Sequence, residues 1–194
     1  MRLRLVLSTL AVFVTASSSA AAAPCPSKHA STVATTPAGR IVETDGPGGN
    51  DEYGLTTHLH LCRPGGREVR VENHGGGIAV GVESVTSASH YIGFREVFTD
   101  VACSKYQGDG CSSARLIAYD MATGRRRSVV GVGPAFVLTD SGWLAWLADG
   151  TVRARVAGAT RTLDAGPVDA ASLTATGTTV SWTRGGAPQS ADLG

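Results

Sequence analysis

Short apolar runs separated by glycine-containing turns recur along most of the chain, and this pattern constrains the fold more than any other feature. The runs are five to seven residues long and rich in Val, Leu, Thr and Tyr. Residues 151–156 place valines on one face and arginines on the other, whereas residues 143–147 are apolar on both faces. Because side chains alternate across a strand, the first run predicts a half-buried strand and the second a strand buried between two layers. Many short strands at this spacing are typical of an all-β sandwich, barrel or propeller.

The strand pattern is also repeated, which favours a propeller. Residues 138–146 align with residues 173–182, and the glycines shared by the two copies, Gly142 and Gly177, lie 35 residues apart. A hairpin with a glycine-bearing turn follows the earlier copies, so that a unit holds four strands. Four units would average 43 residues over residues 23–194, which is the size of a WD40 propeller blade (about 40–45 residues). The units are expected near residues 31–73, 78–131, 135–165 and 169–193, the last with three strands.

Two segments carry a resemblance to bacterial secreted β-propeller-like repeat proteins. Residues 119–125 (Tyr-Asp-Met-Ala-Thr-Gly-Arg) resemble the outer-strand hairpin of these proteins, and residues 180–191 resemble a closing blade. The resemblance implies an all-β fold, a small β-propeller-like array of about four blades of antiparallel strands. Its motifs are generic to the architecture, with neither a Trp-Asp signature nor a kelch pattern, so the resemblance implies a fold and no catalytic residue. A β-sandwich is the alternative fold.

The three-stranded last unit raises the question of closure. Propellers commonly close when the N-terminal segment completes the final blade, and residues 27–35 contain reasonable strand formers. We therefore expect residues 27–35 to pair with residues 189–193. The alternative is local pairing with residues 39–44, which would leave an open stack of blades and a free edge for a dimer or a partner to cover.

The first 23 residues have the three parts of a secretory signal peptide. Arg2 and Arg4 precede an apolar run at residues 5–14, and small residues follow at 17–23. We expect residues 1–22 to be a signal peptide and residues 23–194 to form a single secreted, extracytoplasmic domain. Ten apolar residues in a helix rise about 15 Å, roughly half the hydrocarbon core of a bilayer, so no transmembrane span is expected in the mature protein.

Four cysteines suit an oxidising compartment. Cys103 and Cys111 bracket a short polar loop, so their local closure is the simplest pairing, and it leaves Cys25 to pair with Cys62. A zinc site is the alternative, although the sequence has no Cys-x-x-Cys pair. Lipidation at Cys25 is disfavoured, because Pro24 stands where lipidation signals have a small residue.

The net charge of the chain excludes nucleic acid as an expected partner. The formal net charge is +1, with 17 basic against 16 acidic residues, so the chain lacks the electrostatic footprint of a nucleic-acid-binding protein. Residues 125–127, a run of three arginines, are divided between two faces of a strand and are interpreted as a solvated edge. Trp143, Trp146 and Trp182 occupy positions that match between repeats, so they are interpreted as core residues rather than as a carbohydrate platform.

One cluster has the composition of a metal site. His58 and His60 lie on one face of a predicted strand, and Asp51 lies in the preceding loop. Two histidines and a carboxylate are common metal ligands. The competing interpretation is a pair of surface histidines, and Cys62 favours it, because the predicted disulfide places the N-terminal segment over the same face.

Two classes of function remain. The favoured one is a secreted, non-catalytic binding or interaction module whose partner is an extracellular protein, a glycan or an envelope component. No Gly-x-Ser-x-Gly motif or phosphate-binding loop is present, so no catalytic residue and no cofactor are expected. The alternative is an extracytoplasmic metal-assisted hydrolase or lyase that uses His58, His60 and Asp51. The sequence leaves the ligand and the oligomeric state open.

Overall fold

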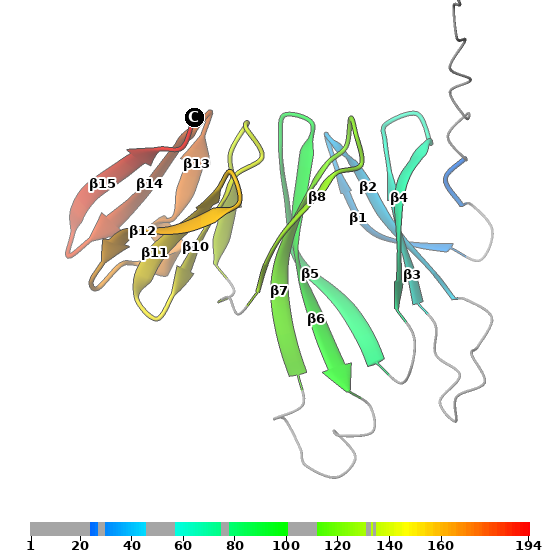
Figure 1. Ribbon diagram of the computed structural model, residues 1–194, viewed down its shortest axis with the longest axis horizontal. Helices are drawn as coiled ribbons and strands as arrows, with labels where there is room; N and C mark the ends of the chain where they lie inside the picture. The colour runs from blue at the N-terminus through cyan, green and yellow to red at the C-terminus, as the bar shows by residue number, and fades with distance from the viewer. Residues whose placement is uncertain are drawn as a thin grey trace, which may run out of the picture.

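Four antiparallel sheets, each made of strands consecutive in the sequence, form the described part of the protein (Figure 1). The computed structural model describes residues 24–26, 30–45, 57–74, 78–100, 112–130, 133 and 135–194. Within these ranges there is no α-helix, and the only helical turn is the 3-10 turn η2 (Ala170–Ser172). No helix in these ranges is long and apolar enough to cross a bilayer. The all-β prediction is confirmed.

Strand order within each sheet follows the sequence, and the sheets agree with the predicted units. The first sheet contains β1 (Ala30–Thr36), β2 (Gly39–Asp45), β3 (Thr57–Cys62) and β4 (Glu68–His74). The second contains β5 (Ile78–Ala88), β6 (Tyr91–Asp100), β7 (Ser112–Asp120) and β8 (Arg126–Val130). The third contains β9 (Phe136–Leu138), β10 (Leu144–Ala148), β11 (Thr151–Val156) and β12 (Ala159–Ala165). The last has three strands, as expected: β13 (Thr174–Thr176), β14 (Thr179–Arg184) and β15 (Ala187–Asp192).

Two-residue turns with positive φ angles close several of the hairpins. Asp149 and Gly150 connect β10 to β11 with φ angles of 51° and 70°, and Gly185 and Gly186 connect β14 to β15 with 56° and 83°. Positive φ at both central residues gives a turn whose twist matches that of the flanking strands, and glycine adopts it without steric cost. This requirement explains why glycines separate the apolar runs in the sequence.

The sheets pack face to face in a row, and a hydrophobic core fills each junction between neighbours (Figure 1). Strand β10 is buried on both faces, as predicted: Leu144 and Trp146 pack toward the second sheet and Ala145 toward the fourth. The first strands of successive sheets, β1, β5, β9 and β13, contact one another in that order. Buried residues at the three junctions include, in turn, Ile41, Leu59, Phe94 and Tyr119; Leu116, Leu138 and Trp146; and Val152, Val180, Trp182 and Leu193.

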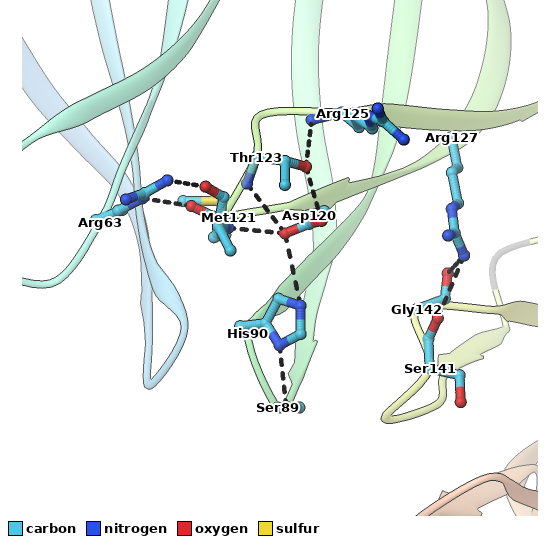
Figure 2. Close-up of polar contacts among 11 residues, drawn as sticks. Arg63, Ser89, His90, Asp120, Met121, Thr123, Arg125, Arg127, Ser141 and Gly142 are labelled. Carbon is cyan, nitrogen blue, oxygen red and sulfur yellow. Dashed lines mark hydrogen bonds and ion pairs between the residues drawn. The ribbon is translucent and has the colours of Figure 1, made fainter. Parts of the chain in front are cut away.

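Arginines bridge the polar ends of two junctions. Arg127 on β8 donates to the carbonyl oxygens of Ser141 and Gly142 at 3.2 and 3.4 Å (Figure 2). Its guanidinium also lies 3.9 Å from the centre of the Trp143 ring. Arg161 on β12 donates to a carbonyl oxygen at the end of β15 at 3.4 Å. The interpretation of residues 125–127 as a solvated edge is therefore wrong for Arg127. Of the three tryptophans, Trp146 and Trp182 are core residues, and Trp143 is half-buried under Arg127.

The predicted pairing between the two ends of the chain is wrong. Strand β1 forms a hairpin with β2, from Ala30 opposite Thr44 to Thr36 opposite Gly39. The sheet of β13, β14 and β15 gains no fourth strand from the described residues. The local alternative prevails because a hairpin closes a far shorter loop than a contact between the chain ends. The expected dimer or partner on the free edge stays a prediction.

The outward face of the first sheet is covered by its own N-terminal segment. Val42 and Cys62 face away from the second sheet and pack against Cys25 and Ala30. A disulfide joins Cys25 to Cys62, with the Cα atoms 5.8 Å apart, which confirms this pairing. The backbone N–H of Cys25 also donates to the carbonyl oxygen of Gly66 at 2.7 Å. The other predicted pair, Cys103 and Cys111, and the signal peptide lie outside the described residues.

The outward face of the last sheet is polar instead of covered. In β14 the buried residues Val180 and Trp182 face the third sheet, whereas Thr179, Ser181 and Thr183 face outward. Terminal units of stacked structures remain soluble when their outer face is polar. The two ends of the row therefore meet solvent by different means, one through a disulfide-bound cover and the other through hydroxyl side chains.

Candidate functional site

A hollow of about 280 Å³ lies where the first and second sheets meet, at the end that carries their hairpin turns. Four turns contribute two lining residues each: those joining β1 to β2, β3 to β4, β5 to β6, and β7 to β8. The lining residues are Pro37, Ala38, Arg63, Pro64, Ser89, His90, Met121 and Ala122. We refer to this feature as the turn-end hollow. Most of its lining is apolar, and the polar groups are supplied by only three of the eight side chains.

Asp120 organises the β7–β8 turn, which forms one wall of the hollow. One carboxylate oxygen accepts hydrogen bonds from the N–H groups of Ala122 (2.7 Å) and Thr123 (3.2 Å), and the other accepts from the Thr123 hydroxyl (2.7 Å) (Figure 2). Desolvation raises the pKa of Asp120, but these hydrogen bonds and the nearby His90 outweigh it and hold the pKa below its usual value. The carboxylate is therefore ionised and committed to the turn.

Arg63 ties this turn to the first sheet. Its Nε donates to the carbonyl oxygen of Met121 at 2.5 Å, and a terminal nitrogen donates to the carbonyl oxygen of Ala122 (Figure 2). Gly124 lets the turn approach the first sheet closely, because a Cβ at this position would lie 2.7 Å from the carbonyl oxygen of Val69. These contacts fix the two sheets against each other at the hollow.

His90 forms the exposed rim. Its side chain is 50% exposed, and its Nε2 lies 3.5 Å from a carboxylate oxygen of Asp120. Its Nδ1 lies 3.3 Å from the hydroxyl of Ser89, and its ring centre is 4.2 Å from that of Tyr91. The carbonyl oxygen of His90 accepts from the N–H of Met121 at 3.0 Å, which holds the rim against the β7–β8 turn.

Two further arginines lie in the turns that line the hollow. Arg67 and Arg125 are exposed, and neither side chain makes a hydrogen bond or ion pair with another described residue. Their backbones are fixed, because the carbonyl oxygen of Arg67 accepts from the N–H of Arg63 at 2.8 Å and that of Arg125 accepts from the N–H of Asp120 at 3.0 Å. Neither arginine is among the residues that line the hollow, and in Figure 2 the Arg125 side chain is directed away from Arg63, Met121 and His90.

The predicted metal ligands lie elsewhere, on the outward face of the first sheet. The rings of His58 and His60 are 6.3 Å apart. Both nitrogens of His60 already have partners, since Nε2 lies 2.9 Å from the hydroxyl of Thr44 and Nδ1 lies 2.6 Å from a carboxylate oxygen of Glu68. Among the described residues no group of three or more His, Cys, Asp and Glu side chains could hold a metal ion. Asp51 lies outside the described residues, so the three-residue site stays a prediction.

The sequence revealed the turns of this site but not the site itself. Residues 119–125 read as a hairpin, and the Pro-Gly-Gly after Arg63 reads as a turn. The hollow exists because four turns from two sheets meet in space, and this depends on how the sheets pack. The hydrogen bonds of Arg63 to a turn 58 and 59 residues away have no local signal in the sequence.

Comparisons of the chain with known protein families, curated proteins and solved structures found no match. The function is therefore inferred from the geometry of the described residues.

Proposed function

We propose that the protein is a secreted, non-catalytic binding module that receives its ligand in the turn-end hollow. The observation that carries this proposal is the convergence of four turns on one mostly apolar hollow of about 280 Å³. Concave, largely apolar sites with a few fixed polar groups are the usual form of a ligand site. The partner would be an extracellular protein, a glycan or an envelope component.

The finer description of the fold belongs to the same proposal. We propose that the four sheets are blades of an open, propeller-like array. The face-to-face packing of consecutive sheets and the contacts from β1 to β5, β5 to β9 and β9 to β13 support it, because the first strand of each blade lines the axis of a propeller. Hairpin turns of neighbouring blades then gather at one end, where propellers commonly present binding surfaces.

An extracytoplasmic location has support in the Cys25–Cys62 disulfide, because such bonds persist in oxidising compartments. The absence of a membrane-crossing helix among the described residues is compatible with it. Export itself would be tested by the intact mass of protein recovered outside the producing cell, which should begin near residue 23. Retention of residues 1–22 in that material would contradict it.

Binding is favoured over catalysis because the polar groups of the hollow already serve the turns. Ser89, His90 and Asp120 form a line with a superficial likeness to a nucleophile, a base and an orienting carboxylate. The two separations are 3.3 and 3.5 Å, longer than the 2.6–3.2 Å of a working relay. Asp120 already accepts three hydrogen bonds from its own turn. These contacts commit the carboxylate to the turn.

The proposal is tested by occupying and then blocking the hollow. N-acetyl-leucinamide supplies one neutral aliphatic side chain, and it should shift the backbone amide resonances of the four lining turns in a two-dimensional NMR titration. Ala122→Trp should abolish these shifts because the indole fills the hollow. Ala159→Trp, a change at an exposed alanine of the third sheet, is the matched control and should leave them intact. Shifts that are absent in the native protein, or unaffected by Ala122→Trp, would contradict the proposal.

A further inference from the structure

We propose that the outward face of the last sheet is a second binding site, and that its ligand is a neutral, hydroxyl-rich glycan. A hollow of about 660 Å³ lies on this face, and we refer to it as the outer-face hollow. Its lining residues are Ser172, Ser181, Trp182, Thr183, Pro188, Gln189 and Ser190. It shares no lining residue with the turn-end hollow, so this inference does not depend on the proposed function.

The strand register brings three hydroxyl groups together in the outer-face hollow. Ser181 and Thr183 are alternate residues of β14, and both face outward because Val180 and Trp182 are buried against the third sheet. Ser190 on β15 lies directly opposite Ser181, so its side chain is on the same face. The hydroxyl groups of two neighbouring strands therefore meet in one hollow.

The turn η2 fixes one wall of this hollow. The N–H of Thr183 donates to the hydroxyl of Ser172 at 2.7 Å, and that hydroxyl donates to the carbonyl oxygen of Asp169 at 2.6 Å. The N–H of Asp169 in turn donates to the carbonyl oxygen of Thr183 at 3.0 Å. Both main-chain polar groups of Thr183 are thus held before a ligand binds. A site that is ordered in advance loses less conformational entropy on binding.

The other polar groups of the hollow have no partner within the described part of the chain. The hydroxyl groups of Ser181, Thr183 and Ser190 and the carboxamide of Gln189 make no hydrogen bond with another described residue. The main-chain N–H and carbonyl oxygen of Ser190 also point away from β14, and no described strand lies beyond β15 (Figure 1). These groups are free to bind a ligand.

The chemistry of the lining points to a neutral glycan. None of the seven lining side chains is charged, so an anionic or cationic polymer gains no ion pair in this hollow. Trp182 is only 4% exposed, which leaves Pro188 as the main apolar surface for a lipid or an apolar side chain. Hydroxyl and carboxamide groups both donate and accept hydrogen bonds, as the hydroxyl groups of a sugar do. Surfaces that only meet solvent are usually rich in charged side chains instead.

An extended peptide is the alternative ligand, because the edge of β15 is unpaired. Two features of the edge disfavour it. Pro188 has no N–H to donate to an added strand. The carbonyl oxygen of Asp192 already accepts a hydrogen bond from Arg161 at 3.4 Å. The edge therefore offers a peptide few main-chain hydrogen bonds, and a glycan that uses the side chains of the hollow is favoured.

A titration with oligosaccharides of different charge tests the inference. Cellohexaose, maltohexaose, xylohexaose and chitohexaose are neutral, and hexagalacturonate is the charged analogue. In two-dimensional NMR spectra at least one neutral sugar should shift the backbone amide resonances of residues 172, 181–183, 189 and 190. It should bind about fivefold or more tightly than hexagalacturonate. The peptide acetyl-Thr-Val-Thr-Val-Thr-amide serves as the probe for strand addition.

Substitutions then assign the binding to the outer-face hollow. Ser181→Ala combined with Thr183→Val removes two hydroxyl groups with little change in volume, and it should weaken the binding of the sugar about tenfold or more. Thr162→Val, at an exposed threonine of the third sheet that makes no hydrogen bond with another described residue, is the matched control and should have no effect. Ala122→Trp should also leave this binding unchanged, because it fills only the turn-end hollow.

Three results would overturn the inference. The first is the absence of shifts with all four neutral sugars, or binding of hexagalacturonate as tight as theirs. The second is a neutral sugar whose affinity does not change in the double variant. The third is tighter binding of the peptide than of any sugar, which would assign the edge of β15 to strand addition.

Discussion

The packing of the second sheet against the third predicts that Gly142→Ala destabilises the protein more than an alanine at a glycine with the same backbone conformation and open space around it, such as Gly158. Gly142 has a φ angle of +73°, which costs an alanine about 1–2 kcal/mol. A Cβ at this position would also lie 2.5 Å from two ring carbons of Tyr91. The ring cannot move freely, because it packs against His90 and contributes to the hydrophobic core between the sheets. Overpacking of this kind costs about a further 1–3 kcal/mol.

Gly158→Ala is the matched control for this substitution. Gly158 has a φ angle of +86°, and a Cβ there would have nothing within 4 Å. It therefore carries the backbone cost without the clash. Urea unfolding of the two variants and of the native protein should show Gly142→Ala less stable than Gly158→Ala by about 1–3 kcal/mol. In a thermal melt this corresponds to a midpoint lower by about 2–12 °C. Equal destabilisation by the two alanines would refute the packing of Tyr91 on this turn.

Two further predictions concern the first sheet and the turn-end hollow. Replacement of both Cys25 and Cys62 by alanine should lower the free energy of unfolding by about 4 kcal/mol, because the disulfide closes a loop with a sequence separation of 37; urea unfolding measures it, and an unchanged midpoint would contradict it. Asp120→Asn should remove part of the acid sensitivity of the protein. The pKa of Asp120 is lowered by folding, so its contribution to stability is present at neutral pH and is lost as the pH falls below the ordinary value of 3.8. Unfolding midpoints measured from pH 7 down to pH 2 should therefore converge for the native protein and the variant at the acid end, and parallel curves would contradict the assignment.

Most of the fold could be predicted from the sequence because the information is local. Apolar and polar residues alternate in residues 151–156, and residues 143–147 are apolar on both faces of the strand. Each pattern reflects how a single strand is buried, and both agree with the structure. Glycines in the turns reflect positive φ angles, which are also a local requirement. The division into four sheets follows from the same signals, since every sheet is made of consecutive strands.

What could not be predicted depends on contacts between sheets. The predicted pairing of residues 27–35 with the C-terminal strand is wrong, because strand-forming residues specify a strand but not the strand with which it pairs. In the structure β1 pairs with β2, which is much closer in the sequence than β15. Alternation along the strand predicts that Arg127 is a solvated edge residue, although it reaches the carbonyl oxygens of Ser141 and Gly142 in the next sheet. The turn-end hollow has no signal in the sequence for the same reason. Long-range packing determines which side chains of different turns become neighbours.

The lowered pKa of Asp164 is a further property that the local sequence does not predict. Asp164 is 9% exposed and accepts from the indole N–H of Trp182 at 2.7 Å and from Arg184 at 2.6 Å. The hydrogen bond from Trp182, followed by the charge and hydrogen bond of Arg184, lowers its pKa despite desolvation. This buried group joins the third sheet to the last. The sequence gives no local signal for these contacts, because Trp182 and Arg184 lie 18 and 20 residues away from Asp164.

Amide hydrogen exchange in β15 tests most directly whether the array is open. The N–H of Leu193 donates to the carbonyl oxygen of Thr178. Since N–H groups alternate in direction along a strand, those of Gln189 and Ala191 also point toward β14, whereas those of Ser190 and Asp192 point away from it. In an open array the amides of Gln189 and Ala191 should be protected, whereas those of Ser190 and Asp192 should exchange at nearly the rate of an unstructured peptide. In a sample shown to be monomeric, protection of Ser190 and Asp192 equal to that of their neighbours would mean that a further strand of the same chain pairs with β15, and it would contradict the open array.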